Sequence, residues 1–165
     1  MHNTATLRTI LLVAGLCAGA GFGDASGRSA AQSDTAKRLI GTWRLVSITD
    51  NGRIDTHRGP RPSGLIYYDA KGYMAVQIMP DRPRPKYAGA SPTPDEAKAA
   101  ISGYTAYFGT YTMDERARTV THHRTGDINP GPLGDFVRRY EFASEDRLIL
   151  RPVESKTALT WERVK

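Results

Sequence analysis

Eight short stretches in which apolar and polar residues alternate dominate the sequence from Gly41 onward. Alternation with a period of two places successive side chains on opposite faces of a β-strand. Turn-forming pairs such as Asn51-Gly52 and Lys71-Gly72 separate several of the stretches. Because most of the connections are short hairpins, the pattern predicts an all-β, eight-stranded antiparallel up-and-down barrel. The predicted strands cover residues 41–49, 64–69, 73–79, 105–113, 118–125, 135–143, 147–153 and 159–164.

One short helix is predicted over residues 94–103. Thr93 is a candidate N-cap, Pro94 suits the first helical position, and Glu96 completes a capping box. Gly103 is a candidate C-cap. Since the apolar side chains of this segment share one face, we expect the helix to pack on the barrel or to close one of its ends. Only a single helical turn is expected ahead of the first strand, over residues 32–38.

The first 31 residues are typical of a signal peptide. Arg8 gives a weak positive charge, residues 9–16 are mostly apolar, and small residues near Ala20 and Ala31 offer cleavage sites. The apolar core is too short to form a stable membrane-spanning helix. A periplasmic or secreted protein is therefore expected, with a barrel domain over residues 32–165. The alternative is a mildly apolar N-terminal extension on a cytoplasmic protein.

Cys17, the only cysteine, lies inside this apolar segment. A lipid anchor at Cys17 is not expected, because Leu16 stands where a lipoprotein signal has a small residue. Once the segment is cleaved, the chain has no cysteine. Disulfides, thiolate catalysis and cysteine-based zinc sites are then excluded.

The chain is basic, with a formal net charge of +6. Removal of residues 1–31, which hold Arg8, Arg28 and Asp24, changes this charge to +5. The basic residues are scattered over Pro- and Gly-rich loops without interleaved aromatic residues, so binding to nucleic acid is not expected. A mild preference for an anionic ligand or surface fits this charge better. The sequence leaves the oligomeric state open.

The stretch Gly41-Thr42-Trp43 resembles the Gly-x-Trp motif that begins the first strand of lipocalins. Arg163, on the last predicted strand, matches the arginine that packs across that tryptophan in lipocalins. Residues 38–165 as a whole resemble the bacterial and fungal lipocalin-like domain family, a calycin-type barrel. The segments that carry this resemblance are 39–47, 64–68, 72–79 with Arg82-Pro83, 104–111, 120–123 and 159–163.

The resemblance implies a barrel with a ligand cavity and no settled activity. It also implies that Gly41, Trp43 and Arg163 have a structural role at the closed end of the barrel. Ligand chemistry is then expected at the opposite end, near the proline-rich loops. Some fungal relatives are encoded among natural-product pathways, so a cyclase or isomerase role stays open.

Polar and aromatic side chains on the predicted strands are the candidate ligand-binding residues. Polar groups inside a small barrel cost free energy unless they are paired or hydrated, so several of them facing inward would indicate a ligand site. The alternative for each tyrosine is a core or rim position with its hydroxyl group in water. A single β-bulge would exchange the two faces of a strand. The candidates are Tyr68, Gln77, Tyr107, Tyr111, His123, Arg138 and Tyr140.

Adjacent residues of a strand point to opposite faces, so His122 and His123 are not expected to bind one metal ion together. No metal site and no cofactor are predicted. An inward histidine has an unperturbed pKa suited to acid–base catalysis near neutral pH. The ordinary interpretation of such a histidine is a hydrogen bond to a Tyr or Thr on a neighbouring strand.

Two functions of different classes follow from the sequence. The first is an exported, lipocalin-like protein that binds a small, largely apolar ligand with a polar or anionic group. The alternative is a barrel-cavity isomerase or cyclase that acts on a small organic metabolite with an inward His123 or a tyrosine, assisted by Arg138. A filled barrel with a structural role is a third possibility. Whether the protein is an enzyme is left open.

Overall fold

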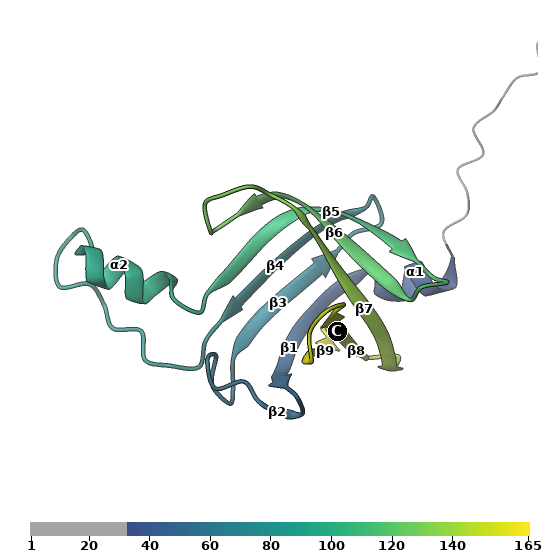
Figure 1. Ribbon diagram of the computed structural model, residues 1–165, viewed down its shortest axis with the longest axis horizontal. Helices are drawn as coiled ribbons and strands as arrows, with labels where there is room; N and C mark the ends of the chain where they lie inside the picture. Colours follow the sequence, from purple (N-terminus) through teal and green to yellow (C-terminus); the bar gives the residue numbers. More distant parts are fainter. Residues whose placement is uncertain (1–32) are drawn as a thin grey trace, which may run out of the picture. The chain divides into compact units, whose positions relative to one another are not determined.

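A computed structural model describes residues 33–165 (Figure 1). The predicted signal peptide, its cleavage sites and Cys17 lie outside the described residues. Within the described range the chain forms two helices and nine strands. The helices are α1 (Asp34–Leu39) and α2 (Pro94–Ile101). The strands are β1 (Gly41–Asp50), β2 (Arg53–Ile54), β3 (Ser63–Tyr68), β4 (Tyr73–Met79), β5 (Thr105–Asp114), β6 (Thr119–Asp127), β7 (Asp135–Ser144), β8 (Arg147–Pro152) and β9 (Thr157–Arg163).

The sheet closes into an eight-stranded antiparallel barrel. Strands β1 and β3 to β9 follow one another around the sheet, and β1 pairs with β9 to complete the ring. This arrangement confirms the predicted all-β, up-and-down architecture. Closure leaves no free sheet edge in the ring, so the backbone hydrogen bonds of all eight strands are used within it.

Strand β2 is an addition to the predicted strands, because none of them lies between residues 49 and 64. It pairs with the end of β1 alone, with Asp50 opposite Arg53 and Thr49 opposite Ile54. The two residues between the strands, Asn51 and Gly52, both have positive φ values of 49° and 77°. Such a two-residue Asn-Gly turn matches the twist of the flanking strands and extends β1 into a short hairpin.

Alternation along the strands separates a buried interior from a solvated outer wall. In β4, for example, Met74, Val76 and Ile78 are buried and their neighbours are exposed. A bulge between Leu45 and Ser47 in β1 breaks the alternation, so that Leu45 and Ile48 both face the core. This bulge accounts for the difference from the face assignment that strict alternation would give for β1.

One end of the barrel is closed by α1 and the start of β1. The Trp43 indole is fully buried and its Nε1 donates to the Leu39 carbonyl oxygen at 2.9 Å. The guanidinium of Arg163 lies 4.1 Å from the centre of the Trp43 ring and donates to the carbonyl oxygens of Ile40, at 2.9 Å, and Arg38. Gly41 has a φ of +130°, and a Cβ there would lie 2.9 Å from Nη1 of Arg163. Glycine is therefore required at this contact.

Helix α2 begins as predicted and then departs from expectation. Thr93 and Glu96 form both hydrogen bonds of the capping box, with Pro94 in the first turn. The helix ends at Ile101, two residues before the predicted limit, and has no buried residue. It extends away from the barrel on the long connection between β4 and β5 (Figure 1). The expectation that it packs on the barrel or closes an end is therefore wrong.

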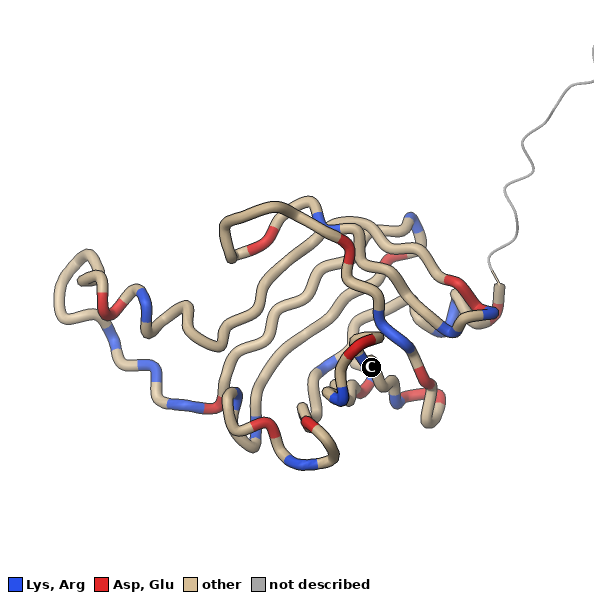
Figure 2. The backbone as a smooth tube through the Cα atoms, viewed as in Figure 1, with Lys and Arg blue, Asp and Glu red and all other residues tan. Residues whose placement is uncertain are grey.

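The charged residues are distributed over many loops and strands, with basic and acidic positions interleaved along the chain (Figure 2). Neither helix in residues 33–165 has the length and apolar character needed to cross a membrane.

Candidate functional site

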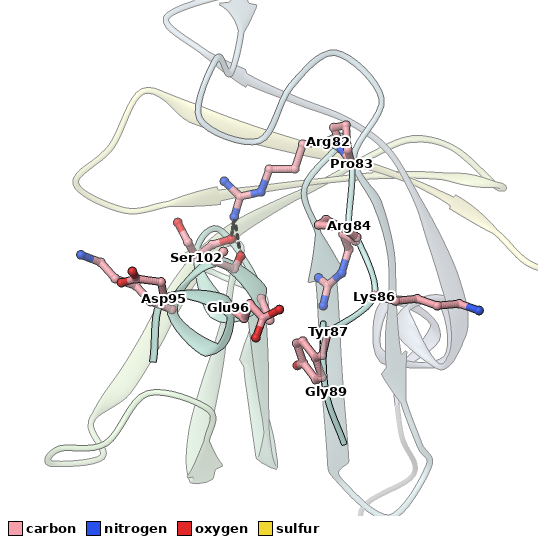
Figure 3. Close-up of a pocket in the computed structure, with 13 residues that line it drawn as sticks. Arg82, Pro83, Arg84, Lys86, Tyr87, Gly89, Asp95, Glu96 and Ser102 are labelled. Carbon is pink, nitrogen blue, oxygen red and sulfur yellow. Dashed lines mark hydrogen bonds between the residues drawn. The ribbon is translucent and has the colours of Figure 1, made fainter. Parts of the chain in front are cut away.

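Two hollows of different character are candidates for a binding site. The larger, about 910 Å³, lies between α2 and the proline-rich loop that precedes it (Figure 3). Arg82 spans it by donating to the carbonyl oxygens of Ser102 and, at 3.4 Å, Ala99, whereas Lys86 points away from the helix. Its walls are an exposed loop and a helix without buried residues, so the lining side chains are not anchored in the barrel core.

The smaller hollow, about 240 Å³, is the barrel cavity, lined by side chains of the strands and by Arg58, while Trp43 does not line it. Its position in the barrel gives each lining side chain a fixed direction, so we identify it as the candidate site. The apolar walls come from Ile48, Ile66, Val76, Ile78, Leu150 and Leu159. The polar groups come from Arg58, Thr105, Tyr107, His122, Arg138, Thr157 and Trp161.

His122 lies between two tyrosines at the base of the cavity. Its Nε2 is 2.7 Å from the Tyr68 hydroxyl and its Nδ1 is 2.9 Å from the Tyr107 hydroxyl. Burial, together with the nearby charge of Arg138, lowers the pKa of His122 from 6.5 to about 3. The imidazole is therefore neutral at physiological pH, with one nitrogen that donates and one that accepts.

The buried hydroxyl of Tyr68 determines which groups donate and which accept in this hydrogen-bond network. The Tyr68 side chain is fully buried, and its hydroxyl has His122 as its only hydrogen-bond partner among residues 33–165. A buried hydroxyl that did not donate would leave its proton unsatisfied, so Tyr68 donates to Nε2. Nδ1 then carries the imidazole proton and donates to Tyr107. The proton of the Tyr107 hydroxyl remains available to the cavity, which Tyr107 lines.

Burial also raises the pKa of both tyrosines. The effect on the Tyr68 pKa is the larger, and the positive charge of Arg138 opposes it at both positions. Both hydroxyls are therefore neutral donors at neutral pH.

Two further N–H donors, on residues that line the cavity, lack a partner. The buried atoms Nε of Arg58 and Nε1 of Trp161 have no hydrogen-bond acceptor within the described part of the chain. The other nitrogens of Arg58 contact Asp55 at 3.3 Å and Thr105 at 3.0 Å. Arg138 forms no ion pair with any residue in 33–165; its guanidinium carbon lies 5.0 Å from the centre of the Phe136 ring. A buried donor without an acceptor costs free energy, so these groups indicate a missing partner.

The sequence profile of the family described as "Lipocalin-like domain" matches residues 40–164. The chain belongs to the lipocalin-like domain family. No curated protein matches the chain. A solved structure from Bacteroides vulgatus, a DUF4847 family protein, is similar at 15% identity with a TM-score of 0.44, over 77% of this chain and 94% of that chain.

The family assignment confirms the resemblance drawn from Gly41-Thr42-Trp43 and the later strand segments. A lipocalin-like barrel suggests the binding of small molecules in general. It does not by itself select a ligand or a reaction.

Of the seven candidate ligand residues in this lipocalin-like barrel, Tyr68, Tyr107 and Arg138 converge around His122. Two more are buried in the barrel outside the cavity lining. Tyr111 packs edge-on against Tyr68 and donates to the Asp69 carbonyl oxygen at 2.7 Å. Tyr140 packs against Phe142 near the closed end. These two side chains fill the half of the barrel that contains Trp43.

The other two candidates, Gln77 and His123, were expected to face the interior and do not. Gln77 is exposed on the outer wall, because β4 turns Val76 and Ile78 inward. His123 lies outside with its ring nitrogens 2.9 Å from Thr112 and 2.9 Å from Asp135. His122 takes the interior position instead. Alternation along β6 places the two adjacent histidines on opposite faces of the strand. It does not determine which of the two faces the interior.

The sequence-based candidates omitted His122, Arg58 and Trp161. Trp161 lies two residues before Arg163 on the last predicted strand, so the two side chains share a face. Because Arg163 was expected to pack on Trp43, this shared face could have indicated that Trp161 points inward. Arg58 comes from the loop between β2 and β3, where no periodicity exists to place it. Among residues 33–165, no cluster of three or more His, Cys, Asp or Glu side chains is arranged to hold a metal ion.

An ion pair lies beside the polar cluster. Arg124 Nη1 contacts the Asp127 carboxylate at 2.6 Å, and its guanidinium carbon lies 3.7 Å from the centre of the Phe136 ring. Burial alone would raise the pKa of Asp127, but hydrogen bonds from the Asn129 amide and Arg124 lower it overall. Arg124 is thus already neutralised, in contrast to Arg138.

Proposed function

We propose that this lipocalin-like protein binds one small, largely apolar molecule in the barrel cavity. The observation that carries the proposal is a hollow of about 240 Å³ inside a closed barrel, with apolar walls and a few fixed polar groups. A solidly packed barrel would have left no room for a ligand.

The cavity volume limits the size of the ligand. An apolar protein cavity of about 150 Å³ accepts benzene, so by proportion this cavity has room for about ten non-hydrogen atoms. Short aliphatic chains and single- or fused-ring aromatic molecules meet this limit, whereas a steroid or a long lipid does not.

The alternative, an isomerase or cyclase, receives less support from the geometry. His123, the proposed acid–base group, lies on the outer wall. Both nitrogens of the inward His122 are occupied by tyrosine hydroxyls, and its pKa of about 3 makes it a weak base. No carboxylate lines the cavity to serve as a base in its place.

Binding is tested by filling the cavity from one wall. Val76→Phe places extra volume inside, whereas Ala75→Phe adds the same ring to the exposed outer face of the same strand. We expect indole and 1-octanol to shift the indole N–H resonance of Trp161 in ¹H–¹⁵N spectra of the wild type and of Ala75→Phe, and not of Val76→Phe. Native mass spectrometry of the protein as purified would identify a retained ligand. Equal responses of the two variants, or no response of the wild type to any small apolar molecule, would refute binding in the cavity.

We further propose that the chain is exported and that residues 1–31 act as a signal peptide. The support is the order of a positive residue, an apolar segment and small residues in the sequence. N-terminal sequencing of the protein from fractionated cells tests this, and a chain that begins after Ala20 or Ala31 in the exported fraction is expected. An intact N-terminus in the cytoplasmic fraction would contradict export.

A further inference from the structure

We propose that the ligand of the barrel cavity is a small apolar monocarboxylate whose carboxylate group binds Arg138 and the neighbouring Tyr107 hydroxyl. This inference rests on the proposed function and names the chemical class of the ligand. It is carried by Arg138, which has no carboxylate partner among residues 33–165 and lines a cavity that no Asp or Glu lines.

Several N–H and O–H donors belong to the residues that line the cavity. Nε of Arg58 and Nε1 of Trp161 are buried without an acceptor in residues 33–165. The Tyr107 hydroxyl proton is also free once Tyr68 and His122 have satisfied one another. A carboxylate presents two oxygens that accept several hydrogen bonds and has no donor when it is ionised. An amine or an alcohol would leave more of these donors unpaired.

The charges in the cavity specify a single negative charge. Two arginines line it, and no Asp or Glu does. The charge of Arg58 is balanced by Asp55, with its Nη1 3.3 Å from Oδ2. Arg138 is partly buried, and among the described residues no carboxylate lies within ion-pair distance of it. A charge that is partly removed from water is less costly with a counter-ion, so a monoanion would complete this site and a dianion would exceed its charge.

The remaining walls require that the rest of the ligand be apolar. Branched aliphatic side chains from β1, β3, β4, β8 and β9 surround the polar groups. With about ten non-hydrogen atoms in all, a carboxylate would leave room for an aliphatic chain of about seven carbons or one substituted aromatic ring.

The test compares octanoate with octanamide, which has nearly the same shape but carries no charge and bears N–H donors. Binding is measured by calorimetry and by the two indole N–H resonances of the ¹⁵N-labelled protein. Trp43 serves as an internal control, because its indole already donates to Leu39 at the closed end. We expect octanoate to bind about ten- to hundredfold more tightly than octanamide, the range of a charge-assisted hydrogen bond. We also expect it to shift the Trp161 resonance and leave that of Trp43 in place.

The matched variants are Arg138→Gln and Arg139→Gln. Both remove one positive charge from the same strand, but Arg139 is exposed on the outer wall. Arg138→Gln should remove the preference for octanoate, whereas Arg139→Gln should keep it within about twofold. Thermal unfolding of both variants shows whether each is folded, and octanamide binding to Arg138→Gln shows whether the cavity is intact.

The outcomes separate this inference from the proposed function. If octanamide binds as tightly as octanoate, or if Arg139→Gln abolishes the preference as fully as Arg138→Gln does, the carboxylate assignment is wrong and binding in the cavity stands. If neither compound, nor indole or 1-octanol, shifts the Trp161 resonance, both the inference and the proposed function fail.

Discussion

The two halves of the barrel each contain a buried tryptophan and an arginine, but their hydrogen bonds differ. At the closed end, Trp43 Nε1 donates to Leu39, and Arg163 donates to backbone carbonyl oxygens while covering the indole ring. In the cavity half, Trp161 Nε1 has no acceptor and Arg138 no carboxylate partner among residues 33–165. The tryptophan and the arginine thus have hydrogen-bond partners within the chain at the closed end. In the cavity half, the tryptophan lacks an acceptor and the arginine lacks a carboxylate partner.

This difference separates structural from functional polarity within one small core. A polar group that is satisfied by the chain itself stabilises the fold, whereas one that is buried without a partner costs free energy in the empty protein. The cost is recovered when a ligand supplies the partner. The closed end therefore serves the fold, and we propose that the cavity half serves binding. The following variants test that division.

The largest expected effect is a loss of stability in acid that originates in His122. The unfolded chain takes up a proton near pH 6.5, whereas folded His122 resists protonation until about pH 3. Its contribution is therefore complete above pH 6.5 and is lost as the pH falls through that window, at about 1.4 kcal/mol per pH unit and about 5 kcal/mol in total. Urea unfolding of the wild type and His122→Gln should show their stability difference change by about 2 kcal/mol between pH 7 and pH 5. A difference that stays constant with pH would contradict a buried neutral histidine.

A smaller effect is expected from replacing each tryptophan with phenylalanine. Trp43→Phe removes the hydrogen bond to Leu39 and part of the contact with Arg163, and it should lower the free energy of unfolding by about 2–3 kcal/mol. Trp161→Phe removes an N–H group that has no partner, so the smaller ring should cost less than about 1 kcal/mol. Urea titrations measure both. Equal losses at the two positions would remove the distinction between the ends.

The arginines provide the same comparison with a smaller difference. Arg163→Met leaves the carbonyl oxygens of Ile40 and Arg38 without their donor and should cost about 1–2 kcal/mol. Arg138→Met removes an uncompensated charge, and it should leave stability within about 0.5 kcal/mol of the wild type or raise it. Thermal unfolding of the ligand-free protein reports both changes. A large loss for Arg138→Met would show that its charge has a partner in the folded chain.

The fold was largely predictable from local chemistry. Strand alternation, Gly41 before Trp43 and the capping box of Thr93 and Glu96 each depend on a few neighbouring residues. Strand β2 could not be separated from the loop, because a two-residue strand has too few positions to show a period. Helix α2 has an apolar face in sequence, but its tertiary contacts decide whether that face is covered.

The site was less predictable because it depends on which face of each strand turns inward. Tyr68, Tyr107 and Arg138 were among the candidates and meet around one histidine. His122 was not, although it is adjacent to the chosen His123. The choice between them is a shift of one residue, which inverts every side chain of a strand. The unpaired donors of Arg58 and Trp161 are a property of three-dimensional packing that no local pattern contains.

The smallest expected effect therefore falls on His123, and it tests the face assignment directly. His123→Gln removes a contact with Asp135 at the surface, where such polar contacts contribute little, so the change in stability should be within about 0.5 kcal/mol. Octanoate binding should be unchanged within about twofold, since the ring lies outside the barrel. His122→Gln, one residue earlier, should alter the Trp161 resonance and the acid sensitivity together. If the two variants exchanged these behaviours, β6 would have the opposite face inside, and the donors assigned to the cavity would have to be assigned again.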